Sequence, residues 1–207
     1  MAWYDTFSNF YDASIERYYA EHRPLAAAAL KLRPGACVLD LPCGTGQSFS
    51  ALTSGVGPEG LVIGADLSLG MLRKAKLRAE RESLATVRVL HGDASALERP
   101  AIDAAAGRPV KLTHLHVFLG MSVFPDMAGT FSHLWGLLES GGRCVLVDVH
   151  ADKLGLQGWL VNKTASADIR RRFWEPLEAV AHGFERHDLP FRREHGGQIM
   201  LAVGVKP

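Results

Sequence analysis

An apolar run, a glycine-rich turn and a helix-forming segment follow one another within residues 37–52, and this pattern constrains the fold most. The apolar run carries a single carboxylate, Asp40, and stops at a turn that contains Gly44 and Gly46. Helix-forming sequence resumes at Phe49. The pattern predicts a buried parallel strand, a tight turn and the start of a helix. Glycines let a ligand approach the backbone closely, and a helix N-terminus offers unpaired N–H groups to an anion.

Proteins that bind dinucleotides use a similar turn, but their fingerprint has a third glycine three residues after the second. In this chain that position is occupied by Phe49. The turn is therefore expected to bind a ligand other than NAD or FAD.

Further segments of the same kind follow along the chain. Residues 61–66 form a second apolar run that ends in an aspartate, and residues 87–94 form a third run that ends in Gly-Asp-Ala. Residues 138–143 contain two glycines and precede another apolar run at 144–149. Strand and helix patterns thus alternate through residue 150, which predicts an α/β fold with a doubly wound, mostly parallel sheet.

Together these segments resemble the class I S-adenosylmethionine-dependent methyltransferases. The glycine turn matches the motif I loop of that family, D-x-x-C/G-G-T/S-G, and residues 66–72 match its D-x-S-x-x-M-L signature. Residues 138–143 match its L-x-P-G-G-x motif, except that Ser140 stands where the proline usually does. The resemblance covers residues 38–150 and implies a Rossmann-like methyltransferase fold with a seven-stranded sheet. It also implies that S-adenosyl-L-methionine is the cofactor.

The composition narrows the class of protein further. The 207 residues suffice for one α/β domain with a full core. The 23 lysines and arginines nearly balance the 22 aspartates and glutamates, so no surface for nucleic acid is predicted. Cys37, Cys43 and Cys144 show neither disulfide nor metal-site spacing, which favours a reduced, cytoplasmic protein. No signal peptide, transmembrane segment or metal site is expected.

The expected organisation is a single methyltransferase domain in three parts. Residues 1–33 are expected to form an N-terminal helical lid, with Pro24 separating two helices. Residues 34–150 are expected to form the cofactor-binding core, and residues 151–207 a C-terminal helix and the antiparallel hairpin that closes the sheet in the resembling family. The remaining expected elements are a loop at 101–111, a fourth strand at 112–119, helices at 127–138 and 168–182, and hairpin strands at 184–189 and 198–205.

The resemblance implies which residues bind the cofactor. Asp40 would act on the ammonium of its amino-acid end, directly or through water, although a carboxylate that caps the glycine turn is also compatible. Asp66 would accept hydrogen bonds from both ribose hydroxyls, with an N-cap for the next helix as the alternative. Asp93 and Ala94 would meet the adenine. The other expected cofactor-binding residues are Pro42, Cys43, Gly44, Thr45, Gly46, Leu67, Met71, Leu119 and Tyr11.

The N-terminal aromatic residues allow two interpretations. Residues 10–12 resemble the Y/F-Y-D that precedes motif I in the small-molecule branch, where a lid tyrosine often touches the cofactor carboxylate. This resemblance is the reason for including Tyr11. An aromatic stripe at helical spacing is otherwise typical of core packing.

The segment after the fourth strand indicates the kind of acceptor. In DNA and protein-amine methyltransferases this place holds a polar N/D-P-P-Y/F box, whereas residues 118–126 are mostly apolar. This difference favours a small-molecule or lipid-linked acceptor. His150 follows the strand at 144–149, near the sheet edge that binds ligands, and is the candidate for a catalytic base. His114 and His116 alternate along a strand without a third metal ligand, so a core or strand-end role is predicted for them.

The expected function is therefore transfer of a methyl group from S-adenosylmethionine to a small molecule. The motifs are most similar to those of the quinone-biosynthesis and phosphatidylethanolamine-type methyltransferases. Two alternatives stay open. The sequence of residues 174–177 resembles that of enzymes that transfer the aminocarboxypropyl group of the same cofactor. The fold alone would also allow a non-catalytic cofactor-binding protein.

Overall fold

The computed structural model describes residues 18–192 and 195–207. Its helices and strands follow in the order α2 (His22–Ala29), β1 (Cys37–Asp40), α3 (Phe49–Val56), β2 (Leu61–Asp66), α4 (Leu69–Arg81), β3 (Val87–His91), α5 (Arg99–Ala106), β4 (His114–Phe118), α6 (Met127–Leu137), β5 (Arg143–His150), α7 (Leu156–Ala165), α8 (Glu175–Glu178), β6 (His182–Asp188) and β7 (Gln198–Val205).

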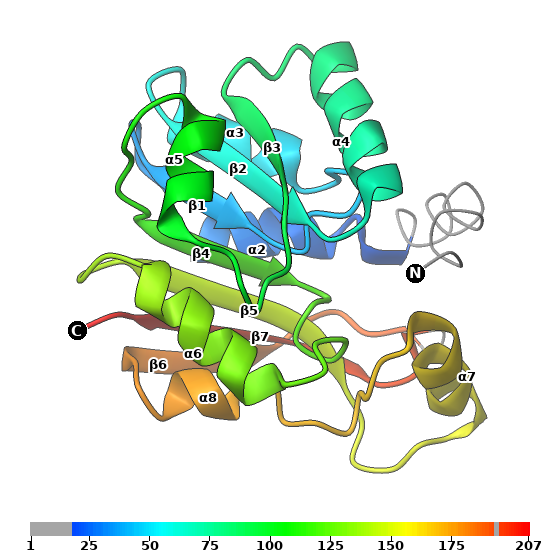
Figure 1. Cartoon of the computed structure of the whole chain (residues 1–207). Coiled ribbons are helices and arrows are strands. Elements are labelled where there is room, and N and C mark those ends of the chain that lie inside the picture. Colours follow the sequence, from blue (N-terminus) through cyan, green and yellow to red (C-terminus); the bar gives the residue numbers. More distant parts are fainter. Residues whose placement is uncertain (1–17, 193–194) are drawn as a thin grey trace.

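The strands form a seven-stranded sheet in the order β3-β2-β1-β4-β5-β7-β6 (Figure 1). The strands β1 to β5 pair in parallel, and β7 pairs antiparallel with both β5 and β6. This arrangement confirms the predicted mostly parallel, doubly wound sheet with its closing hairpin. The chain runs from β1 outward to β3 and then crosses to β4 on the other side of β1. Open α/β sheets bind ligands beside the carboxyl ends of the strands where the order reverses in this way.

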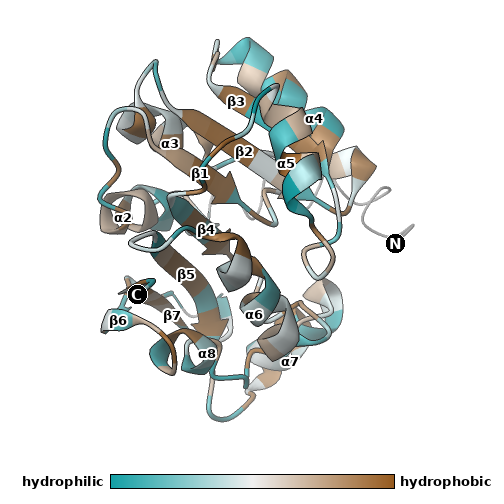
Figure 2. Ribbon diagram, turned by 60° about the vertical axis from the view of Figure 1, so that its left-hand side comes forward, coloured by the Kyte–Doolittle hydropathy of each residue, from teal (hydrophilic) through white to brown (hydrophobic). Residues whose placement is uncertain are grey.

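Helices cover both faces of the sheet because the central strands are apolar on both sides. Neighbouring residues of a strand point to opposite faces, so Val38 and Leu39 of β1 enter two different cores. The core of Val38 also contains buried residues of α2, α3 and α4. The core of Leu39 contains buried residues of α5, α6 and α8. Figure 2 shows the central strands as hydrophobic along most of their length, between helices of mixed character.

The segment predicted as a loop at 101–111 is mostly helical, so that prediction was wrong. Helix α5 has Pro100 in its first turn, where a missing N–H costs nothing. Gly107 ends the helix in the left-handed conformation, with φ 72°, which glycine adopts without steric cost. Ile102 is the buried residue of this helix. A single buried side chain among alanines leaves no apolar stripe in the sequence.

The helix predicted at 168–182 was also wrong. This segment consists mainly of turns and irregular structure, with the short helix α8 within it and the first residue of β6 at its end. Helix α7, which precedes this segment, was not predicted. Leu156 and Trp159 of α7 are exposed, so the outer face of this helix is as apolar as its inner face and no amphipathic pattern is visible.

The predicted lid at 1–33 is described only from Tyr18 onward. Tyr18 and Tyr19 are helical, and the chain turns at residues 20–21 before α2 begins. Pro24 therefore lies in the first turn of α2 and does not separate two helices. Residues 1–17, which include Tyr11, lie outside the described residues.

In the described parts of the chain, no helix is long and apolar enough to span a membrane.

Candidate active site

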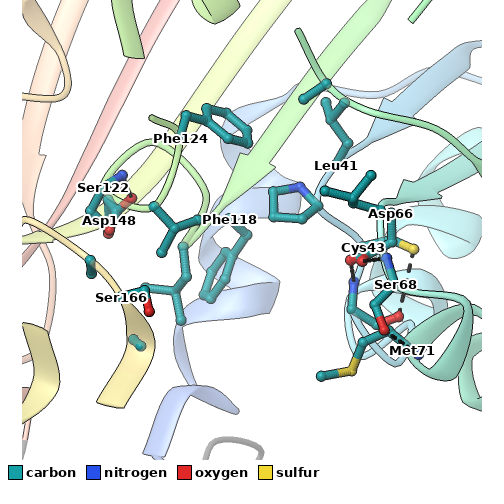
Figure 3. Close-up of a pocket in the computed structure, with 18 of the residues that line it drawn as sticks. Leu41, Cys43, Asp66, Ser68, Met71, Phe118, Ser122, Phe124, Asp148 and Ser166 are labelled. Carbon is teal, nitrogen blue, oxygen red and sulfur yellow. Dashed lines mark hydrogen bonds between the residues drawn. The ribbon is translucent and has the colours of Figure 1, made fainter. Parts of the chain in front are cut away.

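A cavity of about 790 Å³ lies at the carboxyl ends of β1, β2, β4 and β5, where the strand order reverses. Binding sites for small ligands commonly have volumes of about 300–1,000 Å³. In Figure 3, Asp66, Ser68 and Met71 lie on one side of the cavity, and Ser122 and Asp148 lie on the other. We call these two parts the glycine-loop end and the β5 end. The glycine-loop end is lined by Cys43, Gly44, Asp66, Leu67, Ser68, Met71, Asp93 and Ala94, and the β5 end by Ser122, Val123, Phe124, Asp148, Val149 and Ile169.

The glycine turn wraps around the side chain of Phe49. Gly44 and Gly46 both have positive φ, 55° and 76°, which other residues rarely adopt. A Cβ atom on Gly46 would lie 2.5 Å from the Phe49 ring, and a Cβ atom on Gly64 of β2 would lie 2.4 Å from it. Phe49 is fully buried. The ring therefore fills the space that these two glycines leave beneath the turn.

Asp66 is fixed at the end of β2 by two backbone groups. Its Oδ2 accepts from the N–H of Gly44 at 2.9 Å, and its Oδ1 accepts from the N–H of Ser68 at 2.8 Å. Burial raises the pKa of the Asp66 carboxyl above its usual value, against the effect of these hydrogen bonds. The N-cap of α4 is Ser68, whose Oγ accepts from the N–H of Met71. The carboxylate of Asp66 faces the cavity and is not the cap of this helix.

Asp93 lies near the glycine-loop end on the loop after β3. Its Oδ1 accepts from the backbone N–H of Ser95 at 2.8 Å and from the Ser95 hydroxyl at 2.7 Å. These bonds lower the pKa of the Asp93 carboxyl. The carboxylate is therefore ionised at neutral pH and retains lone pairs for a ligand, because an ionised carboxylate has about four acceptor sites.

Asp40 does not line the cavity, although it was expected to act on the cofactor. It is 1% exposed, and its Oδ1 lies 2.7 Å from Nδ1 of His116, which is fully buried. Asp40 and His116 are register partners on the adjacent strands β1 and β4. The predicted core role of His116 is confirmed, but its carboxylate partner was not foreseen. Because Asp40 is buried and outside the lining of the cavity, the geometry does not support direct contact between Asp40 and a ligand there.

His150 does not line the cavity either, which corrects its placement as a base. Its Nδ1 lies 3.2 Å from the carbonyl oxygen of Arg171, and its Nε2 lies 3.3 Å from Oδ1 of Asp152. The ring packs edge-on against Trp174, with 4.8 Å between the centroids. Both nitrogens of His150 are thus engaged outside the cavity.

The carboxylate that does line the β5 end is Asp148, two residues earlier on β5. It is 1% exposed, and burial raises its pKa from 3.8 to about 6. Its Oδ1 accepts from the Ser122 hydroxyl at 2.9 Å, and its Oδ2 accepts from the Ser122 N–H at 2.8 Å. The sequence signal for Asp148 was a lone acid inside an otherwise apolar strand, the same signal that singled out Asp40.

The raised pKa of Asp148 predicts how stability changes with pH. The ionised carboxyl is disfavoured in the folded protein, so the stability that its protonated form contributes is fully present below about pH 3.8. That contribution is lost as the pH rises through about 6, and the shift corresponds to about 3 kcal/mol. Urea unfolding of the wild type and of Asp148→Asn between about pH 4 and pH 7 measures it. The wild type should lose stability relative to the variant as pH rises, and a relative gain would contradict the assignment.

Arg23 of α2 is a second lining residue that was not predicted. Its Nη1 donates to the Ser48 hydroxyl at 2.9 Å, and its Nη2 donates to Oε1 of Gln47. The guanidinium carbon lies 4.4 Å from the centre of the Phe118 ring. These contacts hold a positive charge beside the glycine turn, on the wall of the cavity.

The remaining expected residues form two groups, those that line the cavity and those that do not. Gly46 supports the turn without lining the cavity, and Tyr11 lies outside the described residues. Tyr18 and Tyr19 line the cavity. The expected residues that line it are Pro42, Cys43, Gly44, Thr45, Asp66, Leu67, Met71, Asp93, Ala94 and Leu119.

Comparison with known proteins gives consistent results. Residues 38–142 match the model of a family described as a methyltransferase domain. Over 116 residues the chain is 33% identical to a demethylmenaquinone methyltransferase of Lactococcus lactis subsp. lactis (strain IL1403), covering 55% of this chain and 42% of that protein. Over 143 residues it is 31% identical to a nocamycin O-methyltransferase of Saccharothrix syringae, covering 68% of this chain and 47% of that protein. The chain thus spans about half the length of the curated relatives it matches.

The fold is also that of a solved structure. The geranyl diphosphate C-methyltransferase of Streptomyces coelicolor A3(2), solved with S-adenosyl-L-homocysteine, superposes with a TM-score of 0.73 at 16% sequence identity. The superposition covers 92% of this chain and 77% of that chain.

Proposed function

The chain belongs to the methyltransferase domain family, and on that premise we propose that it transfers the methyl group of S-adenosylmethionine to a small molecule. The observation that carries this proposal is the two-ended cavity at the reversal of strand order. Its glycine-loop end offers carboxylates and bare backbone for the cofactor. Its β5 end is mostly apolar and leaves room for a second molecule.

The cofactor roles follow from the groups at the glycine-loop end. Asp66 accepts from the ribose hydroxyls with the lone pairs that its two backbone donors leave free. Asp93 accepts from the exocyclic amine of adenine, and the N–H of Ala94 donates to a ring nitrogen. Leu67 and Met71 flank the purine with apolar contacts. These roles are supported by the lining of the cavity and by the spacing of the motifs.

Arg23 supplies the charge that the amino-acid end of the cofactor requires. Its guanidinium lies beside Gln47 and Ser48, at the turn where that end would bind. A guanidinium matches the geometry of a carboxylate and stays protonated at any relevant pH. Asp40 is buried, bonded to His116 and outside the lining of the cavity, so no direct contact with the cofactor is assigned to it.

Methyl transfer requires little from the protein beyond the alignment of the two reactants. The methyl group of the sulfonium is already activated, and the reaction is an in-line displacement by the acceptor atom. The protein binds both reactants at the correct distance and keeps water out. A residue that takes a proton is required only when the acceptor must lose one.

The β5 end favours a small-molecule or lipid-linked acceptor. Its lining is mostly apolar, with Val123, Phe124 and Ile169, and the polar side chains there, Ser122 and Asp148, are hydrogen-bonded to each other. The matched relatives are named demethylmenaquinone methyltransferase and nocamycin O-methyltransferase, which supports a small molecule here. No observation favours aminocarboxypropyl transfer or a non-catalytic role over methyl transfer. All three cysteines are free and buried, which supports the location of the protein in a reducing compartment, the cytoplasm.

The cofactor assignment predicts a ligand preference. S-adenosylhomocysteine should raise the apparent melting temperature more than NAD or FAD, because Phe49 fills the position of the third dinucleotide glycine. A ligand at about 100 times its Kd stabilises the native state by about 2.7 kcal/mol. Thermal-shift measurements with the three ligands at equal concentration test this. An equal or larger shift with a dinucleotide would overturn the cofactor assignment.

The acceptor class is tested with S-adenosylmethionine that carries a labelled methyl group. Label should appear in extractable small molecules when a mixed metabolite fraction is supplied. Label that appears only in added DNA or protein would contradict the proposed acceptor class. A heat-inactivated sample of the same protein controls for spontaneous methylation.

A further inference from the structure

The most polar feature of the β5 end is the pair formed by Ser122 and Asp148. Ser122 lies in the loop after β4, and Asp148 lies on the neighbouring strand β5 (Figure 3). Both residues are buried, at 6% and 1% exposure, and both line the cavity. The surrounding lining at this end consists mainly of apolar side chains, among them Phe118, Val123 and Ile169.

Every polar group of this pair is held in position. The Asp148 carboxylate accepts from the Ser122 hydroxyl, the Ser122 N–H and the N–H of Val149, all at 2.8–2.9 Å. The carbonyl oxygen of Ser122 accepts from the N–H of Asp168 at 2.9 Å. Within the described residues, no lysine, arginine or histidine forms an ion pair with Asp148.

Ser122 and Asp148 each keep a chemical function that cofactor binding does not use. The Ser122 hydroxyl donates its proton to Asp148 and keeps both lone pairs for another donor. Asp148 carries a buried carboxylate with which no cationic side chain of residues 18–192 and 195–207 forms an ion pair. A sulfonium cofactor in the same cavity would bring the opposite charge, and that charge disappears when the methyl group leaves.

Resting on the proposed function, we propose that Ser122 and Asp148 bind an acidic hydroxyl of the methyl acceptor and take up the proton that it loses on methylation. The acceptor is then a compact, largely apolar phenol or enol. The acceptor O–H donates to Oγ of Ser122, while the Ser122 hydroxyl donates to Oδ1 of Asp148.

The step balances in atoms and charge. The acceptor oxygen forms a bond to the methyl carbon, and the carbon–sulfur bond breaks with its electron pair going to sulfur. The acceptor proton moves to Ser122 as the Ser122 proton moves to Asp148. One positive sulfonium and one negative carboxylate become a neutral thioether and a neutral carboxylic acid, which later returns its proton to water. The raised pKa of Asp148, about 6, suits a group that is ionised at neutral pH and can still hold a proton.

A purely structural role would consist of bracing the loop after β4 against β5. The Ser122→Ala variant separates the two roles, because it removes only the hydroxyl. The backbone bonds from residues 122 and 149 to Asp148 stay in place. Ser54→Ala is the matched control, since the Ser54 hydroxyl also donates to an oxygen of the protein, the carbonyl of Ser50, but Ser54 does not line the cavity.

The experiment measures methyl transfer from S-adenosylmethionine to ring-substituted phenols of graded acidity. Ser122→Ala should lower kcat by about 100-fold for the least acidic phenols, in the range that general-base catalysis supplies. The loss should shrink steadily as the phenol becomes more acidic, because an ionised phenol has no proton to give. Asp148→Asn should show the same trend, and Ser54→Ala should show neither effect. The affinity of Ser122→Ala for S-adenosylhomocysteine should equal that of the wild type.

Two kinds of result would overturn the proposal, and a third would refute the proposed function on which it rests. A loss that is uniform across the phenols, or no loss, would reduce the pair to a structural brace. Methylation of amines or thiols by the wild type, with every phenol refused, would exclude a hydroxyl acceptor while the proposed function stands. Failure of the wild type to bind S-adenosylhomocysteine would instead refute the proposed function itself.

Discussion

Replacement of Phe49 by alanine is expected to lower the free energy of unfolding by about 3–5 kcal/mol, the usual cost of deleting a buried aromatic side chain. The ring is fully buried and occupies the space above Gly46 and Gly64, which have no side chains to relax into the hole. The glycine turn would also lose the side chain around which it wraps. Urea unfolding of the variant against the wild type measures the loss.

A double-mutant cycle makes this prediction specific to the packing at Phe49. Gly64→Ala alone should destabilise the protein, because its Cβ would lie 2.4 Å from the ring. In the Phe49→Ala background the same change should cost much less, since the added methyl group enters the vacated space. Additive effects of the two substitutions would show that the ring and the glycine do not share this space.

Replacement of Asp66 by alanine is expected to weaken S-adenosylmethionine binding by about 1.5–3 kcal/mol, the cost of losing hydrogen bonds to a charged group. The carboxylate lies at the end of β2 beside the glycine turn, and backbone donors at Gly44 and Ser68 hold it there. Titration calorimetry with S-adenosylhomocysteine measures the change in affinity.

The control for this experiment is Asp126→Ala. Asp126 is also a carboxylate that accepts from a backbone N–H, that of Gly129 at the start of α6, but it does not line the cavity. Its loss should leave the affinity unchanged. Unchanged affinity in a folded Asp66→Ala variant would contradict the assignment of Asp66 to the ribose hydroxyls.

The sequence predicted the parts of the fold that depend on local patterns. The strands β1 and β2 are mostly apolar runs that end in an aspartate, and β3 is followed by Gly92 and Asp93 where the chain turns. Local patterns failed where an element had little to bury. Helix α5 buries only Ile102, and α7 exposes Leu156 and Trp159, so neither shows a clear amphipathic stripe.

The glycine-loop end of the cavity was predicted better than the β5 end, for a related reason. The residues at the glycine-loop end directly follow their strands, so their positions in the sequence determine their positions in space. Contacts at the β5 end depend on strand pairing and on the exact direction of each side chain. His150 and Asp148 are two residues apart on β5, yet Asp148 lines the cavity whereas His150 bonds to the carbonyl oxygen of Arg171. The pairing of Asp40 with His116 likewise joins residues far apart in the chain.

The central claim is that the cofactor loses its methyl group, and the nucleoside product tests this most directly. The protein is incubated with S-adenosylmethionine and a mixed fraction of small-molecule acceptors, and the nucleosides are separated by chromatography and identified by mass. Methyl transfer predicts S-adenosylhomocysteine, formed in equal amount with a methylated acceptor. Methylthioadenosine as the main product would instead show transfer of the aminocarboxypropyl group and would contradict the account. Unchanged S-adenosylmethionine, in a protein that binds it, would contradict it equally.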